Sequence, residues 1–584
     1  MPTLNWIGKE AVVNHHQQVP FHLLKDVPDL GCGDPGSGNL IVEGDNLTAL
    51  KALLPYYAGQ VKCIYIDPPY NTGNEGWIYN DNVKSPVITE WLGKVVGKEG
   101  ETLDRHDRWL CMMYPRLALL RQFLRDDGII MVSIDDHEAS NLRAIMNEVF
   151  GLQNFVSQLI WEKGRKNDAK LFSVGHEYVI VYAKSAARLK DLNTRWRTEK
   201  EGASEIYAEY LRLKDLHEGD LVRVEADLHS FYRNLPRGHP SKKHARYNKV
   251  DQSGVWRDDN MSWPGGNGPR YDVIHPITNQ PCRVPDGGWR YATVEKMNEM
   301  IISGKVIFRD DHTLPPIRKT YLVRSEEDQV EDDEEEDNED IGGQVMGSYF
   351  YRSGIQASNV ITGIFGEQIF PNPKDHEILA KLISYVTSGD KQCLVLDSFG
   401  GSGTTAHAVM HLNKHDNGRR RFIMVEMETE IAKSVTSERA RKIINGYNKP
   451  NEETIDGLGG GFRFCQLGEP LFDESGKIRE SVRFAELARH VYFSETGEPL
   501  PKERVPNTPF LGECRGVGIY LLFNGILGDK SASGGNMLTR AVLEKLPPFD
   551  GPKVIYCTGC LLGRERLSAE QIIIRQTPYE IKTA

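Results

Sequence analysis

The sequence predicts a doubly wound α/β fold, in which helices cover both faces of a mostly parallel sheet. The first observation is an alternation of short apolar strands and helix-like segments over residues 37–184. The second is the return of this alternation within residues 346–459. The third is the polar, irregular sequence between them, which lacks the alternation and indicates an inserted domain. The two halves of one sheet-forming domain are therefore expected to flank the insert.

The length of the chain also requires more than one domain. At 584 residues it exceeds what a single hydrophobic core holds, so roughly two to four domains are expected. Strand signals such as "GIYLLFN" and "KVIYCTG" indicate a small α+β domain near the C-terminus. The expected division is an N-terminal arm at 1–36, the first half of the sheet-forming domain at 37–184, the insert at 185–345, the second half at 346–459 and a separate C-terminal interaction domain at 460–584.

The first half begins with a strand, a helix and a strand over residues 37–70. Apolar residues recur at helical spacing within "LTALKALLPYYAG", at Leu47, Leu50, Leu53 and Leu54. The alternation then continues with a helix, a strand, a second helix and two strands. These elements are expected at 109–128, 129–136, 137–151, 155–163 and 177–184.

The second half repeats the same alternation. Its elements are expected as a helix at 376–388, a strand at 392–399, a helix at 403–413, a strand at 420–427 and a charged helix at 429–446. In open α/β sheets ligands bind at the carboxyl ends of the strands. Polar residues that directly follow a strand are therefore the candidates for a functional site.

A glycine-rich turn follows one of these strands, in "LVLDSFGGSGTTAHAV" at 394–409. Gly400, Gly401 and Gly403 allow a tight turn and a close approach to a ligand, whose negative groups would meet the helix N-terminus. Glu426, at the end of the next strand, stands where nucleotide-binding α/β folds place a carboxylate for ribose hydroxyls. The turn alone also fits dinucleotides or a plain strand–helix connection. It lacks the lysine of a phosphate-binding NTPase loop.

A second polar stretch, "DPPY" at Asp67–Tyr70, directly follows the apolar strand Cys63–Ile66. There the Asp67 carboxylate and the Pro68 carbonyl would accept hydrogen bonds from an amino group, and the Tyr70 ring would stack on a planar base. Gripping both hydrogens of an exocyclic amine favours its pyramidal form and aims the lone pair at an electrophile. The alternative is a turn that ends the strand, since Pro-Pro and Asn-Thr-Gly are common breakers.

Together, "DPPY" and "DSFGGSGTT" at Asp397–Thr405 resemble the motifs of the DNA amino-methyltransferases that use S-adenosylmethionine. The catalytic motif precedes the cofactor motif, as in the permuted β group of that family. The wider sequence is similar to the modification subunits of type III restriction–modification systems, in segments such as "LNWIGKEAVVNHH", "LDRHDRWLCMMYPRL", "HEYVIVYAK" and "FPNPKDHEIL". The resemblance spans nearly the whole chain and is weakest in the insert and the C-terminal domain. It implies a Rossmann-like methyltransferase sheet with an inserted target-recognition domain.

The resemblance also assigns roles to individual residues. It implies that the catalytic motif consists of Asp67, Pro68, Pro69 and Tyr70. It implies that S-adenosylmethionine is held by Asp397, Phe399, Gly401, Gly403, Thr404 and Glu426, with Lys374 and Asp45 as further candidates. Asp375 stands where the family often has a second proline after "FPNPK", a departure that bears on the Lys374 contact. Asp45 equally fits a helix N-cap.

The activity that the resemblance implies is sequence-specific methylation of adenine N6, after the base is flipped out of the duplex. Asp in the first motif position favours adenine N6 over cytosine N4 in this family. The alternatives are N4-cytosine methylation, methylation of RNA or of a protein side-chain amide, and a DNA-recognition subunit of a defence complex whose methylation is secondary. The resemblance implies a homodimer, and any helicase or nuclease of such a phage-defence system would be a separate restriction subunit.

The insert contains a basic stretch suited to DNA. "FYRNLPRGHPSKKHARYNK" has no acid, and its bases are interleaved with tyrosines and turn residues. Such bases suit phosphate contacts with double-stranded DNA, which set the register without reading the sequence. The predicted DNA-binding residues are Arg233, Arg237, Lys242, Lys243, Arg246 and Lys249. The alternative is a solvated loop.

The net charge of −11 conceals an uneven distribution. Residues 326–340 hold twelve acids and no bases, and the rest of the chain carries a net charge of +1. This acidic linker is either a solvated, flexible segment or a mimic of phosphate that competes for a basic nucleic-acid site.

The remaining composition indicates a cytoplasmic protein without a metal site. The nine cysteines are scattered, and the lone "CTGC" without a second pair favours reduced thiols over zinc. No window reaches the about 18 apolar residues of a membrane span, and the N-terminus lacks the pattern of a secretory signal.

Overall fold

The computed structural model describes residues 3–72, 105–164, 171–323, 343–387, 389–501, 508–528, 535–578 and 581. The chain folds into two compact units, of which one combines Met1–Arg195 with Gly347–Ala584 and the other is Trp196–Met346. The expected insert begins at residue 185, whereas the second unit begins at Trp196, because helix α7 (Ala186–Asp191) belongs to the first unit. The acidic linker 326–340 lies outside the described residues.

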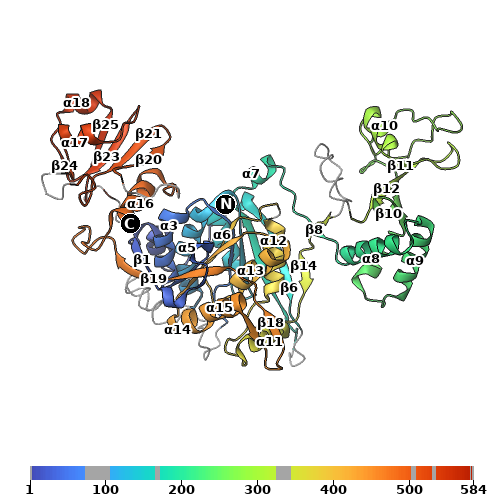
Figure 1. Cartoon of the computed structure of the whole chain (residues 1–584), viewed down its shortest axis with the longest axis horizontal. Coiled ribbons are helices and arrows are strands. Elements are labelled where there is room, and N and C mark those ends of the chain that lie inside the picture. The colour runs from blue at the N-terminus through green and yellow to red at the C-terminus, as the bar shows by residue number, and fades with distance from the viewer. Residues whose placement is uncertain are drawn as a thin grey trace. The chain divides into compact units, whose positions relative to one another are not determined.

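The first unit is built on a central sheet that has eleven strands among the described residues (Figure 1). Parallel pairing runs from β19 to β5, and β7 and β6 follow antiparallel. In spatial order the strands are β1 (His22–Asp26), β19 (Gly461–Pro470), β3 (Leu40–Glu43), β16 (Arg421–Glu426), β15 (Leu394–Asp397), β4 (Val61–Ile66), β5 (Leu124–Ile134), β7 (His176–Ala183), β6 (Phe155–Glu162) and β14 (Tyr349–Tyr351), with β2 (Cys32–Gly33) paired to β19.

Helices pack against both faces of this sheet, because its central strands are mostly apolar and buried on both sides. One face carries α3 (Asn46–Tyr57), α5 (Arg105–Phe123) and α6 (Ala139–Phe150), whose apolar residues share one core with Val42, Ile64 and Leu396. The residues of α12 (His376–Val386), α13 (Thr404–Asp416) and α15 (Glu438–Asn445) lie outside that core, and α13 packs on α12, α15 and β16. The prediction of a doubly wound α/β fold is confirmed.

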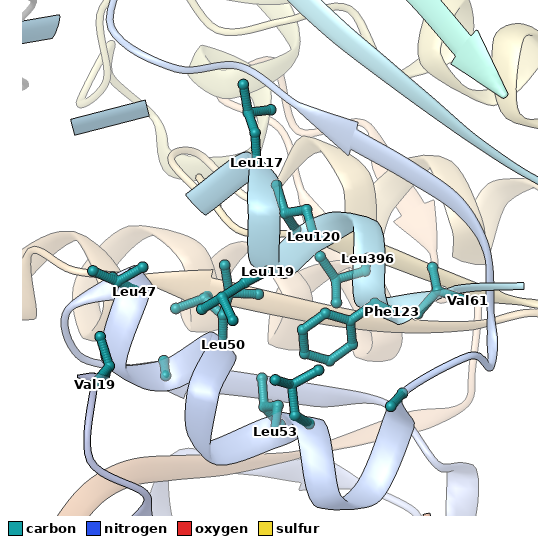
Figure 2. Packing of buried hydrophobic residues seen from close by; sticks show 14 of the residues in the cluster. Val19, Leu47, Leu50, Leu53, Val61, Leu117, Leu119, Leu120, Phe123 and Leu396 are labelled. Atoms are coloured by element: carbon teal, nitrogen blue, oxygen red, sulfur yellow. The ribbon is translucent and has the colours of Figure 1, made fainter. Parts of the chain in front are cut away.

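The core between α3, α5 and the sheet fixes the strands that carry the candidate motifs. Leu50, Leu53 and Phe123 are fully buried there (Figure 2). Replacing one such leucine by alanine costs about 2–5 kcal/mol, since the cavity collapses only in part. The packing of α3 and α5 against the sheet therefore holds the ends of β4 and β15 rigidly.

Several elements differ from the sequence-based expectation. The helix expected at 109–128 ends at Phe123, and β5 begins at Leu124 with a bulge before Ile129 pairs with Cys63. The polar residues of the bulge pair with one another, since Asp127 accepts hydrogen bonds from both Arg125 and Lys62. The charged helix expected at 429–446 consists of α14 (Thr429–Ile431), a π-helical turn (Ala432–Ser437) and α15.

The C-terminal region is not a separate unit. Its first strand, β19, joins the central sheet between β1 and β3, because Phe462, Phe464 and Cys465 are buried there. Leu511 and Ile519, farther along the chain, belong to the same core as α3. The remaining elements are α16 (Phe484–Thr496), α17 (Arg540–Lys545), α18 (Arg564–Ala569), the four-stranded sheet of β20 (Phe510–Cys514), β21 (Val517–Leu521), β23 (Lys553–Cys557) and β25 (Ile572–Gln576), and the short pair β22 (Met537–Leu538) and β24 (Gly559–Cys560).

Shorter elements complete the first unit. They are α1 (Lys9–Val13), α2 (His15–Gln18), α11 (Gly354–Phe365), β17 (Gly446–Asn448) and β18 (Thr454–Asp456). In the parts of the chain that the structure describes, no helix has both the length and the apolar character needed to cross a bilayer.

The second unit is α+β and contains helices that the sequence reading missed. Two of them, α8 (Ala203–Leu216) and α9 (Leu221–Asn234), lie in sequence read as irregular because polar residues dilute their apolar faces. Asp220 caps α9 by accepting from the Val222 and Arg223 amides. The other elements are α10 (Val294–Ile302), the four-stranded sheet of β11 (Val306–Ile307), β12 (Ile317–Tyr321), β10 (Gly254–Asp259) and β9 (Lys249–Asp251), and the pair β8 (Thr198–Glu199) and β13 (Gly343–Gln344).

Candidate active site

A pocket of about 560 Å³ in the first unit joins the two candidate motifs. It lies at the carboxyl ends of β4 and β15, which are neighbours in the sheet although they are far apart in the sequence. Nine of the predicted site residues line it, namely Asp67, Pro68, Pro69, Tyr70, Lys374, Asp397, Phe399, Gly401 and Thr404. The sheet order thus assembles one site from the two halves of the chain.

The "DPPY" stretch is held from both sides. Trp109, which is fully buried on α5, donates from its indole N–H to the Pro69 carbonyl at 2.7 Å. The Tyr70 hydroxyl donates to Asp67 at 2.9 Å. Burial, with the Asp67 and Glu177 carboxylates nearby, raises the pKa of Tyr70 well above its ordinary value, so the phenol stays protonated. The motif therefore presents a preset carboxylate and ring at the strand end.

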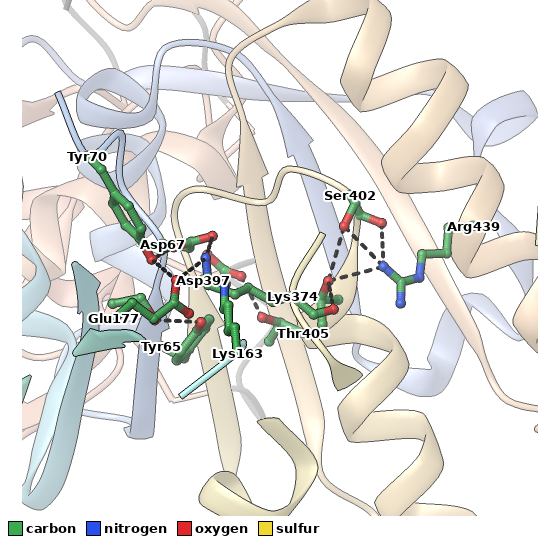
Figure 3. Close-up of polar contacts among 12 residues, drawn as sticks. Tyr65, Asp67, Tyr70, Lys163, Glu177, Lys374, Asp397, Ser402, Thr405 and Arg439 are labelled. Carbon is green, nitrogen blue, oxygen red and sulfur yellow. Dashed lines mark hydrogen bonds and ion pairs between the residues drawn. The ribbon is translucent and has the colours of Figure 1, made fainter. Parts of the chain in front are cut away.

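Two acids and two lysines form a charged cluster at the pocket, consisting of Asp67, Lys163, Glu177 and Lys374 (Figure 3). Lys374 Nζ lies 2.6 Å from Asp67 Oδ2 and 3.7 Å from Glu177 Oε2. Lys163 Nζ lies 2.6 Å from the same Glu177 oxygen, to which the Tyr70 hydroxyl also donates at 3.1 Å. Burial by itself raises the pKa of Glu177, but the two ammonium groups outweigh it and lower the pKa below its usual value. Glu177 is therefore ionised.

Strand direction explains why these residues meet. Asp67 follows the end of β4, and Lys163 follows the end of β6. Glu177 is the second residue of β7, which runs antiparallel to both β5 and β6. The start of an antiparallel strand lies at the same sheet edge as the ends of its parallel-running neighbours.

The glycine-rich turn is organised by Asp397 at the end of β15. Asp397 accepts from the Phe399 amide at 3.0 Å and from the Thr405 hydroxyl at 2.5 Å. Burial raises the pKa of Asp397 to about 8 against these two hydrogen bonds, and the Asp67 and Glu426 carboxylates add to the rise. An uncharged carboxyl at the pocket wall is a group that a bound cation would ionise.

Three predicted cofactor residues are not among the described residues that line the pocket, and each has a structural role instead. Glu426 accepts from the Gly401 amide at 2.7 Å and so ties the turn to β16. Gly403 takes a left-handed φ of 79° as the N-cap of α13, where a side chain would be strained. Asp45 caps α3 through the Thr48 amide at 2.9 Å and pairs with Arg116 at 3.0 Å, so the helix-cap alternative describes it in this structure.

The sequence reading missed five residues that shape the site, namely Trp109, Lys163, Glu177, Thr405 and Arg439. The buried Arg439 guanidinium donates to the Ser402 carbonyl at 3.0 Å and to the Thr404 hydroxyl at 3.1 Å. A signal for Glu177 was an acid next to the apolar strand "YVIVYA". For Arg439 it was a base on the buried face of a helix that follows the cofactor motif. Within the described residues, no group of three or more His, Cys, Asp or Glu is placed to hold a metal ion.

The predicted DNA-binding residues lie in the second unit and fall into two groups. Lys242 donates to the Leu235 carbonyl at 2.6 Å, and Lys249 pairs with Asp258 at 2.8 Å. Both lysines thus have structural partners, and their contact with DNA stays a prediction. The exposed members of the set are Arg233, Arg237, Lys243 and Arg246.

Comparison with known proteins agrees with the two motifs. The sequence profile of the DNA methylase family matches residues 61–437, which include both halves of the pocket. The Mod subunit of the type III restriction-modification enzyme EcoP15I from Escherichia coli is 32% identical over 465 residues, covering 76% of this chain and 67% of that protein.

Two further relatives carry similar names. The StyLTI Mod subunit from Salmonella typhimurium is 30% identical over 77% of this chain and 61% of its own length. The EcoPI Mod subunit from Escherichia phage P1 is 30% identical over 74% of this chain and 64% of its own length. This chain thus spans between 61% and 67% of these three relatives. The resemblance expected from the sequence is confirmed, and the chain belongs to the DNA methylase family as a relative of the type III Mod subunits.

Proposed function

We propose that this protein transfers a methyl group from S-adenosylmethionine to the N6 amino group of adenine in double-stranded DNA. The observation that carries the proposal is that one pocket is lined by both the amine-accepting "DPPY" stretch and the glycine-rich turn. A flat base fits beside Tyr70, and its amino group meets the Asp67 carboxylate and the Pro68 carbonyl. An adenine inside the duplex must first be flipped out, at a cost of about a few kcal/mol.

The residues around the turn fit the cofactor. Asp397 is a buried carboxyl at the pocket wall whose pKa of about 8 calls for a cationic partner, and the cofactor carries an ammonium and a sulfonium. Phe399 lines the pocket beside it and supplies an apolar surface. When bound, the cofactor supplies an electrophilic methyl group. The chain's own residues orient the amine and exclude water, so positioning supplies most of the rate enhancement.

The partners follow from the same proposal. The exposed bases of the second unit would contact DNA phosphates, and the protein would act as a homodimer beside a separate restriction subunit with helicase or nuclease activity. The enzyme would act in the compartment that contains the DNA. The sequence predicts that this compartment is the cytoplasm.

Labelled S-adenosylmethionine and single-molecule sequencing test the proposal directly. DNA from a host with the gene should carry N6-methyladenine at one sequence motif that is unmodified without it. Asp67→Ala should lose at least about 100-fold in methyl transfer, because the amine is no longer oriented. Asp126→Asn, an exposed acid on the β5 bulge, is the matched control and should keep full activity. Modified cytosine N4, or no modified base, would overturn the proposal.

A further inference from the structure

The charged cluster places an ammonium where the substrate's amino group is expected. Lys374 Nζ lies 2.6 Å from Asp67 Oδ2, while the other Asp67 oxygen accepts from Tyr70. Lys374 Nζ also lies 4.9 Å from the centre of the Tyr70 ring, on which the base would stack. An ammonium on an ionised carboxylate is a stronger partner than a neutral amine. A base that enters the pocket must therefore compete with Lys374 for Asp67.

Glu177 offers the displaced ammonium a second carboxylate. It is 5% exposed, and its Oε1 has no hydrogen-bond partner among the residues that the structure describes. Its other oxygen, Oε2, already lies 3.7 Å from Lys374 Nζ. A buried acceptor without a partner is costly, so the site gains when a donor reaches it.

We propose that Glu177 is a positioning residue that receives Lys374 when the target base enters, and that Lys374 holds Asp67 in place of the substrate's amino group until then. The inference rests on the proposed function and extends it. Before the base enters, the pairing with Asp67 keeps the Lys374 ammonium, whose side chain is 7% exposed, from being an isolated buried charge. When the base arrives, Lys374 passes to Glu177 and leaves Asp67 to the amine.

The move also suits the charge that develops during transfer. The amino nitrogen would form a bond to the methyl carbon as the bond from that carbon to the cofactor's sulfur breaks, and the electron pair of the broken bond would stay on the sulfur. The nitrogen would thereby gain a positive charge, which it would lose as one of its two protons passes to solvent. An ammonium that stayed beside Asp67 would repel this charge, whereas one on Glu177 lies farther away. Lys163, 2.6 Å from Glu177, helps to keep that carboxylate ionised and ready.

The test uses full-length protein and duplex DNA that keeps adenine at the methylated position and carries 2-aminopurine as its neighbour, so that fluorescence reports when the adenine leaves the stack and is captured. Glu177→Gln should weaken base capture by at least about tenfold, because Lys374 then stays on Asp67. Adding Lys374→Met to this variant should restore capture. Adding Lys163→Met instead restores the same net charge but leaves Lys374 in place, and capture should stay weak.

Each outcome decides the question. Unchanged capture in Glu177→Gln, equal rescue by both second substitutions, or rescue by neither would overturn the inference. Thermal unfolding and the far-ultraviolet circular dichroism spectrum of every variant show whether the fold is intact. Wild-type protein that methylates adenine, with Glu177→Gln capturing the base normally, refutes only this inference. Wild-type protein that methylates no adenine refutes the proposed function.

Discussion

Trp109 and Pro69 are joined by a 2.7 Å hydrogen bond from the indole N–H to the proline carbonyl. The contact connects α5, on one face of the sheet, to the strand end that carries Asp67. Since Pro69 has no amide hydrogen and fixes its own φ, holding its carbonyl also fixes the orientation of the preceding Pro68 carbonyl. The Pro68 acceptor of the amine clamp thus depends on Trp109, which is not among the residues that line the pocket.

Replacing Trp109 by phenylalanine should therefore loosen the clamp. The substitution leaves the Pro69 carbonyl without its donor, which costs about 1–3 kcal/mol in the free energy of unfolding, measured by urea denaturation. We expect kcat to fall while the affinity for DNA outside the target site is unchanged. Trp256→Phe is the control, because the Trp256 indole N–H has no partner among the described residues. Equal losses of kcat in both variants would show that ring size alone matters.

Asp397 should make cofactor binding depend on pH. The pKa of its buried carboxyl is raised from 3.8 to about 8, so the cofactor-free protein holds a proton there at neutral pH. The cationic cofactor favours the ionised carboxylate, and its affinity should rise by up to about tenfold per pH unit below pH 8 and level off above it. Isothermal titration from pH 6 to 9 measures the profile, which should be flat for Asp397→Asn.

The raised pKa of Asp397 also predicts how the stability of the cofactor-free protein depends on pH. Because the pKa is higher in the folded than in the unfolded chain, the stabilisation from Asp397 is complete below pH 3.8 and is lost as pH rises to about 8. As the pH rises across this window, the melting temperature of the wild type should therefore fall relative to that of Asp397→Asn. A constant difference between the two proteins would contradict the raised pKa.

Arg439 should control the affinity for the cofactor from behind the glycine-rich turn. Its guanidinium donates to the Ser402 carbonyl and the Thr404 hydroxyl. Arg439→Met removes the guanidinium donor from both groups in the interior, and the turn should bind S-adenosylmethionine about tenfold or more weakly by titration calorimetry. Arg441→Met, on the same helix, removes a partly exposed guanidinium that contacts Asp29 and Glu438 rather than the turn. A similar loss in that control would assign the effect to the helix as a whole.

The sequence predicted the two motifs and most of the strands, since short apolar runs that end in polar residues identify strand ends without tertiary information. It did not show that β4 and β15 are neighbours, because the order of strands depends on packing between distant segments. Glu177 was missed for the same reason, since only the antiparallel direction of β7 brings it to the site edge. Asp45 shows the opposite error, in which the sequence suggested a site residue that the structure places in a helix cap. A residue at a strand end is often the N-cap of the following helix.

The four exposed bases of the second unit should determine how DNA binding responds to salt. Each of Arg233, Arg237, Lys243 and Arg246, when replaced by alanine, should lower the slope of log affinity against log salt by about 0.9 if it contacts a phosphate. The loss should be the same for specific and unrelated duplexes, because phosphate contacts do not read sequence. Fluorescence anisotropy across a salt series measures the slope.

Arg212 provides the matched control for this set. It lies on α8 of the same unit, has a 59% exposed side chain and pairs with Glu209 at 2.8 Å. Its replacement removes the same charge from the same unit and should leave the slope unchanged, because the Glu209 carboxylate already neutralises it. If Arg212→Ala lowers the slope as much as the other four, binding responds to the net charge of the unit. The predicted phosphate-contact surface would then be wrong.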